Sequence, residues 1–171
     1  MSPHEIFARM SPESASQLLS YLFEKEKPLY KAMIDSLAKQ RNLRPVFVER
    51  KPRNERFAWI QAALGRRNSE AVAAQLLQIW LVGAHSKLLC DFLDGLGIAH
   101  DEKGMVESLP DAPAKEQLIP VLDDLLTKHD PTVVAIYLHA FQGLDDKGGW
   151  PTLEELLQSD PRLQLAAKAA A

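Results

Sequence analysis

The sequence predicts an all-α protein, built either as stacked helical hairpins or as an irregular bundle of seven to eight helices, with one extended arm near 42–52. Three observations support this class. The 171 residues are 46% apolar and 25% charged, which is the balance of an ordinary globular domain. Serine–proline and aspartate–proline pairs recur where helices can begin. The apolar residues that follow these pairs recur at intervals of three and four, the period of an amphipathic helix.

The expected helix starts share one pairing, a side chain with an acceptor oxygen followed by proline. The oxygen can accept a hydrogen bond from a free backbone N–H at the N-cap, and proline has no N–H to leave unsatisfied at the first helical position. These pairs are Ser2-Pro3, Ser11-Pro12, Asp130-Pro131 and Asp160-Pro161. They mark four helix starts before any hydrophobic pattern is considered.

The apolar pattern then predicts individual helices in the first half of the chain. Two are expected near 12–26 and 28–41, joined at Pro28, and a third over about 53–64 that ends at Gly65. We expect Gly65 to adopt a left-handed conformation, since only glycine does so at little cost.

The segment 42–52 has a different composition from the helices around it. Pro45 and Pro52 bracket the triplet Val46-Phe47-Val48. β-Branched and aromatic residues favour extended backbone, and the sequence offers no second strand to pair with the triplet. The segment is therefore predicted to be an extended arm that lies across the helices.

The second half of the chain contains an internal echo. Sliding residues 71–96 forward by 45 positions aligns nine pairs of apolar residues, among them Trp80 with Leu125. Each stretch is followed by a similar polar loop, Asp101-Glu102-Lys103-Gly104 or Asp145-Asp146-Lys147-Gly148. The echo predicts two copies of one antiparallel helical hairpin, over about 70–104 and 115–148.

This period and layout resemble those of HEAT and armadillo helix-pair repeats. The resemblance implies a solenoid, in which neighbouring repeats bury each other's apolar faces, and a solenoid needs about three repeats. The 12–41 hairpin would serve as a degenerate first unit, and the helices after Thr152 and Pro161 as a terminal cap. Pro120, inside the first helix of the later copy, removes an N–H and should kink that helix unless the helix starts nearby. A compact irregular bundle therefore stays open as the alternative.

Domain organisation and compartment follow from composition. One all-α domain is expected over 1–164, followed by an alanine-rich tail, 165–171, that frays. The single cysteine, Cys90, can form no intrachain disulfide, which fits a reducing compartment. Charges at Glu5 and Arg9 interrupt any secretory leader, and the most apolar stretch is shorter than the roughly 20 residues that span a bilayer. The sequence therefore predicts a cytoplasmic protein.

Charge is divided unevenly along the chain. Residues 31–67 hold ten Lys or Arg against three acids, whereas 100–171 hold thirteen acids against six bases. In the most basic part, 39–67, cations are interleaved with Phe47 and Trp59. The candidate partner-binding residues are Arg41, Arg44, Arg50, Lys51, Arg53, Arg56, Trp59, Arg66 and Arg67.

Two interpretations of this basic segment stay open. A cationic surface with aromatic side chains can meet phosphates and stack on bases, so nucleic-acid backbone binding through 39–67 is one alternative. Alternatively, the segment folds against the acidic half of the same molecule or of a neighbour. The second interpretation is favoured, because nucleic-acid-binding domains tend to have a pI above about 9, and the pI of this chain is about 6.0.

Residues suited to catalysis or metal binding are few. His100-Asp101-Glu102 offers three ligand types in one loop, and His129 precedes Asp130, but adjacent residues seldom converge on one ion. On a helical wheel His139 falls outside the apolar arc of 133–141, so it is expected to be solvated. We predict no catalytic residue, no cofactor and no metal. A small metal-dependent hydrolase that uses His100 and Asp101 is kept as an alternative.

The sequence does not determine the function. The best interpretation is a non-catalytic, helical-repeat-like protein-interaction module of a cytoplasmic protein, because stacked helices expose a long surface without needing a polar cleft. Its partner is expected to be a protein, with nucleic acid as the alternative. Trp59 is expected to be an exposed anchor, and Trp150 a plug over the end of the last hairpin.

Overall fold

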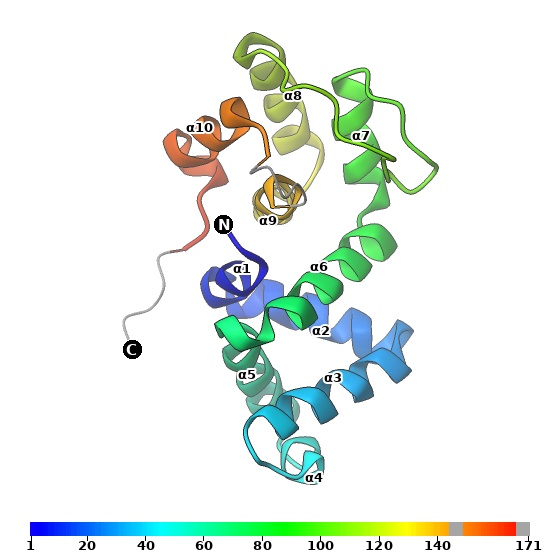
Figure 1. Ribbon diagram of the computed structural model, residues 1–171, viewed down its shortest axis with the longest axis vertical. Helices are drawn as coiled ribbons and strands as arrows, with labels where there is room; N and C mark the ends of the chain where they lie inside the picture. Colours follow the sequence, from blue (N-terminus) through cyan, green and yellow to red (C-terminus); the bar gives the residue numbers. More distant parts are fainter. Residues whose placement is uncertain (144–148, 167–171) are drawn as a thin grey trace. The chain divides into compact units, whose positions relative to one another are not determined.

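The computed structural model describes residues 1–143 and 149–166, and Figure 1 shows its course. In chain order the elements are α1 (Pro3–Arg9), α2 (Pro12–Lys25), α3 (Lys27–Gln40), α4 (Pro45–Glu49), α5 (Arg53–Leu64), the 3-10 helix η1 (Arg67–Ser69), α6 (Glu70–Ala84), α7 (Ser86–Gly95), α8 (Lys115–Lys128), α9 (Pro131–Gln142), α10 (Pro151–Ser159) and the 3-10 helix η2 (Pro161–Leu163). The described residues contain no strand. The prediction of an all-α helical bundle is therefore confirmed.

The contacts divide the chain into two compact units, which are described separately. Unit 1 comprises Met1–Ser2 and Leu81–Leu165, and the main part of unit 2 is Pro3–Trp80. The boundary between them falls inside α6. A single domain over 1–164 stays a prediction, as does the association of the basic segment with the acidic half of the chain.

The predicted helix starts are confirmed where an acceptor side chain precedes proline. The Ser11 hydroxyl accepts a hydrogen bond from the Ser14 N–H at 3.1 Å and caps α2. The Asp130 carboxylate accepts from the Thr132 N–H at 2.8 Å and caps α9. Asp160 caps the short η2 turn in the same way. These local bonds satisfy N–H groups that no helical carbonyl can reach.

The predicted extended arm at 42–52 is wrong, because its centre is the short helix α4. Arg44 is indeed extended (φ −78°, ψ 134°), but Pro45 then occupies the first helical position, for which its fixed φ is suited. At the other end, Arg56 donates a hydrogen bond from Nη1 to the Glu49 carbonyl at 2.9 Å. Burial of Val48 and this bond from α5 together override the weak β preference of the triplet.

Gly65 does end α5, but the predicted left-handed conformation is wrong. Its φ is −70°, which any residue can adopt. A Cβ added at Gly65 would lie 3.2 Å from both Cα and Cβ of Ala8. Glycine is therefore favoured here by the close approach of α1 to α5, rather than by backbone conformation.

The helices α6, α7, α8 and α9 match the predicted repeat in extent but not in geometry. Shifted by 45 positions, α6 and α7 fall on α8 and α9 at their first residues. The chain bends by 84° between α6 and α7, however, so this pair is not an antiparallel hairpin. The antiparallel hairpin predicted over about 70–104 is therefore wrong for α6 and α7. A repeat relationship with helix-pair solenoids stays a prediction. The loop Asp145-Asp146-Lys147-Gly148 and residues 167–171 of the predicted tail lie outside the described residues.

No single helix in the described part of the chain is both long and apolar enough to cross a membrane. Only the bent pair over Arg67–Ala84 and Ser86–Gly95, taken together, reaches that length and composition.

Each unit has its own apolar core. In unit 2 the inner faces of α2, α3 and α5 meet, and Leu22, Ile34 and Ile60 are almost completely buried. The core of unit 1 is aromatic, with the rings of Phe92, Phe141 and Trp150 in mutual contact and the Phe141 and Trp150 centroids 4.9 Å apart.

Trp150 is buried at the start of α10, as the prediction of a plug required. Its indole N–H donates to the Pro110 carbonyl at 3.0 Å. The Gln142 side chain accepts from the Trp150 N–H and donates to the Trp150 carbonyl, both at 3.0 Å. The two bonds with Gln142 fasten Trp150, directly before α10, to the end of α9.

Candidate functional site

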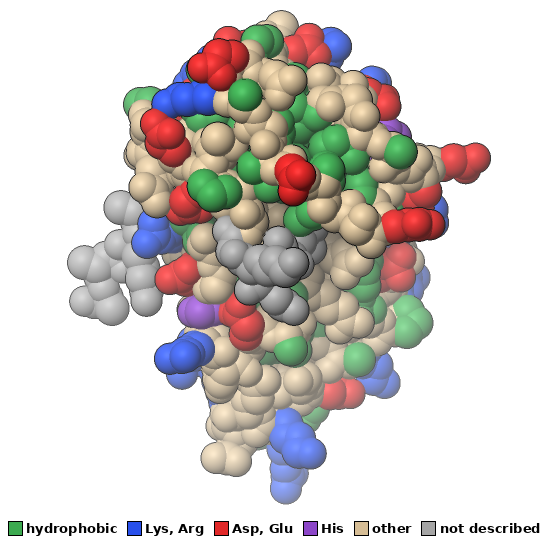
Figure 2. All heavy atoms as spheres, turned by 45° about the horizontal axis from the view of Figure 1, so that its top comes forward, with side chains coloured by type: hydrophobic (Ala, Val, Ile, Leu, Met, Phe, Trp, Pro, Cys, Tyr) green, Lys and Arg blue, Asp and Glu red, His purple; other side chains and the backbone are tan. Residues whose placement is uncertain are grey.

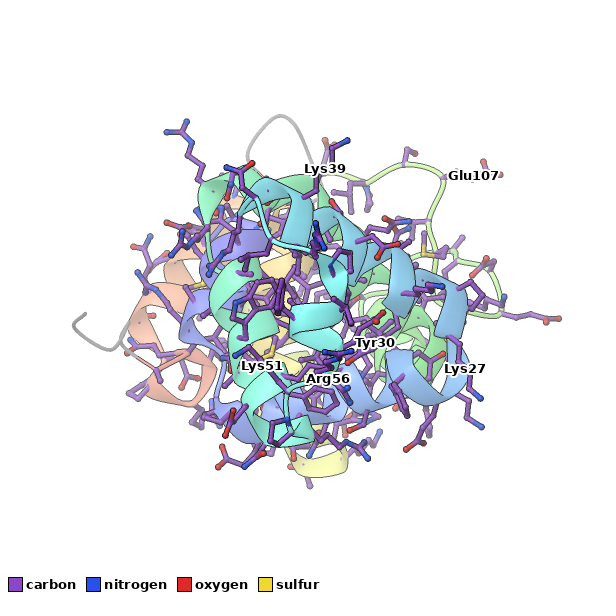
Figure 3. The ribbon with its side chains drawn as sticks, turned by 90° about the horizontal axis from the view of Figure 1, so that it is seen from below. Lys27, Tyr30, Lys39, Lys51, Arg56 and Glu107 are labelled. Carbon is purple, nitrogen blue, oxygen red and sulfur yellow. The ribbon has the colours of Figure 1, made fainter. Side chains whose placement is uncertain are left out.

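Apart from Arg67, the predicted partner-binding residues belong to three elements of unit 2 that contact one another, or to the residues directly flanking them: α3, α4 and α5. We call this area the basic α3–α5 surface; its members are Phe23, Tyr30, Arg41, Leu43, Arg44, Val46, Phe47, Arg50, Lys51, Arg53, Arg56, Trp59 and Arg66. Figure 3 looks onto these three helices, with Lys27 and Lys39 near opposite ends of α3, and Tyr30 and Arg56 close together. Arg67 begins η1 beyond the end of α5.

At the start of α5, two arginines lie over aromatic rings. The guanidinium carbon of Arg53 is 5.2 Å from the centroid of Phe57 and 5.8 Å from that of Phe23. Arg53 also donates a hydrogen bond to the Ser20 hydroxyl at 2.9 Å. The Arg56 guanidinium lies 6.0 Å from the Phe23 centroid. Ring faces attract cations, so both guanidinium groups are held in place while Arg53 stays exposed to solvent.

Beneath these arginines lies the buried side chain of Tyr30, which is 6% exposed. Burial raises the pKa of Tyr30, and the nearby charge of Arg56 opposes that shift without cancelling it. Among the described residues, neither the Tyr30 hydroxyl nor Nε of Arg56 has a hydrogen-bond partner. Nε of Arg56 can only donate a hydrogen bond, whereas the Tyr30 hydroxyl can donate or accept one. Cationic donors therefore outnumber acceptors at this end of the surface.

A second cationic group is centred on Trp59. The Arg41 guanidinium lies 5.1 Å from the centroid of the Trp59 ring. Burial, followed by the charge of Arg66, lowers the pKa of Arg41. Nη2 of Arg41 is a third buried donor without a partner in the described residues. Trp59, expected to be an exposed anchor, is half-buried with Arg41 over it.

The charge of the surface is not neutralised within the part of the chain that the structure describes. None of the eight predicted Arg and Lys residues has a carboxylate within ion-pair distance there. In unit 1, by contrast, acids such as Asp91, Asp123 and Asp124 each have a cationic partner. Figure 2 shows acidic side chains dispersed among apolar and cationic ones over the face in view. Residues 3–80 carry thirteen Lys or Arg against eight Asp or Glu.

Exposed apolar side chains lie beside these cations. Phe47 on α4 is 58% exposed, Phe23 and Leu43 are 41% exposed, and Val46 is 37% exposed. Sequence reasoning identified Phe47 but missed the contribution of Phe23 and Tyr30. In the sequence Phe23 only continues the apolar period of α2, and no sequence signal shows that arginines from α5 cover its ring.

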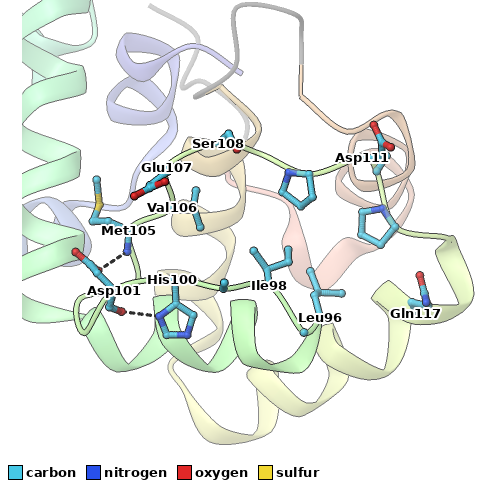
Figure 4. Close-up of a pocket in the computed structure, with 15 residues that line it drawn as sticks. Leu96, Ile98, His100, Asp101, Met105, Val106, Glu107, Ser108, Asp111 and Gln117 are labelled. Atoms are coloured by element: carbon cyan, nitrogen blue, oxygen red, sulfur yellow. Dashed lines mark hydrogen bonds between the residues drawn. The ribbon is translucent and has the colours of Figure 1, made fainter.

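The loop after α7 in unit 1 borders a cavity of about 1110 Å³, shown in Figure 4. His100 on this loop has Nε2 2.8 Å from a carboxylate oxygen of Asp94 and Nδ1 2.6 Å from the Asp101 carbonyl. The Asp101 carbonyl, and then the Asp94 side chain, raise the pKa of His100. The Asp101 carboxylate accepts from the N–H groups of Lys103 and Met105, and these bonds lower the pKa of Asp101.

These hydrogen bonds stabilise the loop after α7, so His100 and Asp101 both have a structural role. Both ring nitrogens of His100 face oxygen acceptors, and the Asp101 carboxylate closes its own turn. The described residues contain no group of three or more His, Cys, Asp or Glu side chains placed to hold a metal ion. Nothing in the described geometry therefore supports the metal-dependent hydrolase alternative.

His139 is the clearest departure among the candidate residues. It was expected to be solvated, but it is 7% exposed, and its Nε2 donates to the Leu163 carbonyl at 3.0 Å. The prediction is wrong because α9 is covered on a second side, where η2 packs against it. Cys90 is half-buried on α7, and burial together with Asp94 raises the pKa of its thiol, which disfavours the reactive thiolate.

Comparison of the chain with protein-family models, with curated proteins and with solved structures finds no match.

Proposed function

We propose that this chain is a non-catalytic protein-interaction module that binds an acidic partner through the basic α3–α5 surface. The observation that supports the proposal is an excess of positive charge and of hydrogen-bond donors. Guanidinium groups are held over aromatic rings without a carboxylate partner in the described residues. Among the described residues, the buried N–H groups of Nε of Arg56 and Nη2 of Arg41, and the buried Tyr30 hydroxyl, have no hydrogen-bond partner. Carboxylates of a partner supply both the charge and the acceptors.

The apolar part of the surface favours a protein partner over a nucleic acid. Phe47 could stack on a base or fill a protein pocket, so it favours neither. Leu43 and Val46 are exposed aliphatic side chains, which have no flat face for stacking. Arginine and aromatic side chains are typical of the energetically important centre of protein interfaces, and Leu43 and Val46 add apolar area that a protein partner can bury around them.

Nucleic-acid backbone binding is the second candidate, and the unpaired cations support it. Binding to a nucleic-acid backbone is recognised by an affinity that falls steeply as the salt concentration rises. Neutralising six to eight phosphates of a duplex makes affinity fall by on the order of a thousandfold or more between 50 and 200 mM salt.

Site-specific photocrosslinking tests the proposal. Phe47 is replaced by p-benzoylphenylalanine in the full chain, which is then irradiated in nuclease-treated extract of its native cells. We expect a protein adduct that is lost when Arg44→Glu and Arg50→Glu are added. Ile119, 41% exposed on α8 of unit 1, is the matched control position. Equal adducts from both positions, insensitivity to charge reversal, or adducts that form only without nuclease would contradict the proposal.

A further inference from the structure

We infer that the occupant of the basic α3–α5 surface is an acidic amphipathic segment of a partner protein, in which Asp or Glu side chains stand next to large apolar ones. The inference rests on the proposed function and specifies the chemistry of the partner. It follows from the two separate groups of unsatisfied donors and from the exposed apolar side chains beside them.

The unsatisfied donors indicate where the partner segment carries its Asp or Glu side chains. One group comprises the Tyr30 hydroxyl and Nε of Arg56, and the other is Nη2 of Arg41 over Trp59. The two groups belong to different arginines, Arg56 on α5 and Arg41 just after α3. Two carboxylates on the partner can therefore accept from both groups, after small rotations that bring the buried N–H groups to the interface.

The arginines are already ordered for this task. Arg53 and Arg56 are held by Phe23, by the Ser20 hydroxyl and by the Glu49 carbonyl. A planar guanidinium in a fixed position binds a carboxylate through two parallel hydrogen bonds. Because these side chains are already restricted, they lose little conformational entropy on binding, and the binding free energy is more favourable.

The exposed apolar side chains indicate where the partner segment carries its large apolar residues. Phe47 is the most exposed large apolar side chain in the described residues, and it lies on α4 next to Val46. Leu43 precedes α4 and is also exposed. A purely acidic chain would leave these groups in water. A segment with Leu or Phe beside its carboxylates buries them while the carboxylates reach the arginines.

Fluorescence anisotropy with defined probes tests this inference on the full chain. The probe is a labelled peptide of four Leu-Glu-Glu-Phe repeats. Two control peptides replace every Glu by Gln, or every Leu and Phe by Ser, and a sixteen-nucleotide oligothymidylate represents nucleic acid. The variants are Arg56→Gln, Phe47→Ser and Tyr30→Phe. Arg9→Gln, on α1 of the same unit, is the matched control, and circular dichroism checks that each variant keeps its helicity.

We expect the Glu-containing peptide to bind at least tenfold more tightly than either control peptide. Arg56→Gln and Phe47→Ser should each weaken binding about tenfold, Tyr30→Phe severalfold, and Arg9→Gln less than twofold. Equal binding of the Ser-substituted peptide, equal loss with Arg9→Gln, or tighter binding of the oligonucleotide would overturn the inference. If photocrosslinking at Phe47 captures a protein but the probe peptide fails, the proposed function stands and this inference falls; if both fail, both fall.

Discussion

Replacing Gly104 by alanine tests the packing of the loop that follows α7. Gly104 and Gly97 both lie in unit 1 and have positive φ values, 76° and 69°. At Gly97 an added Cβ meets no atom within 4 Å, so only the left-handed backbone is penalised, by about 1 kcal/mol. At Gly104 the Cβ would lie 2.4 Å from Cβ of Leu89 and 3.0 Å from the backbone of Cys90. Such overpacking adds about 1–3 kcal/mol.

The two variants therefore form a matched pair. We expect Gly97→Ala to destabilise the protein by about 1 kcal/mol and Gly104→Ala by about 2–4 kcal/mol. Urea unfolding, followed by circular dichroism and by tryptophan fluorescence, measures both changes, and one kcal/mol corresponds to about 2–4 °C in Tm for a chain of this size. Equal losses for the two variants, or a stable Gly104→Ala, would refute the close approach of this loop to α7.

Three further changes probe unit 1. Asp101 and then Asp94 raise the pKa of His100, so its protonation stabilises the fold most fully below the unfolded pKa of about 6.5, and that stability is lost as pH rises through the folded pKa. His100→Gln should flatten urea midpoints across this window, and a wild-type midpoint that rises there would contradict the assignment. Trp150→Phe should cost about 1–3 kcal/mol in urea unfolding, because it removes the indole hydrogen bond and leaves a small cavity. Asp130→Ala should cost about 0.5–2 kcal/mol and Asp130→Ser much less, since serine can still cap α9.

The helix boundaries could be predicted because their signals are local. Ser11 and Asp130 bond to N–H groups two or three residues further along the chain, so the sequence alone contains both partners. The predicted 53–64 helix coincides with α5, and 12–26 and 28–41 differ from α2 and α3 by one residue at one or both ends. Local bonds of this kind do not depend on the rest of the fold.

Features that depend on a second element could not be predicted. The helical form of Pro45–Glu49 depends partly on a hydrogen bond from Arg56 on α5. The glycine at position 65 is explained by Ala8 on α1. A helical wheel can assign one buried face, but His139 is buried because α9 is covered on a further side by η2.

In the basic α3–α5 surface too, local features could be predicted from the sequence and tertiary ones could not. The sequence places cations between positions 39 and 67, but a count of charges treats Arg56 and the exposed Arg9 alike. What distinguishes Arg56 is the ring of Phe23 from α2 beside it and the hydroxyl of Tyr30 from α3 beneath it, both brought there by tertiary packing. An arginine on a free helix face satisfies its donors with water and gains little from a partner. Nε of Arg56 is a buried donor without an acceptor among the described residues. A carboxylate of a partner would supply that missing hydrogen bond. Under the proposed function, selectivity for an acidic partner depends on where donors are left unsatisfied, and a mutation such as Tyr30→Phe, which changes no charge, tests this dependence most directly.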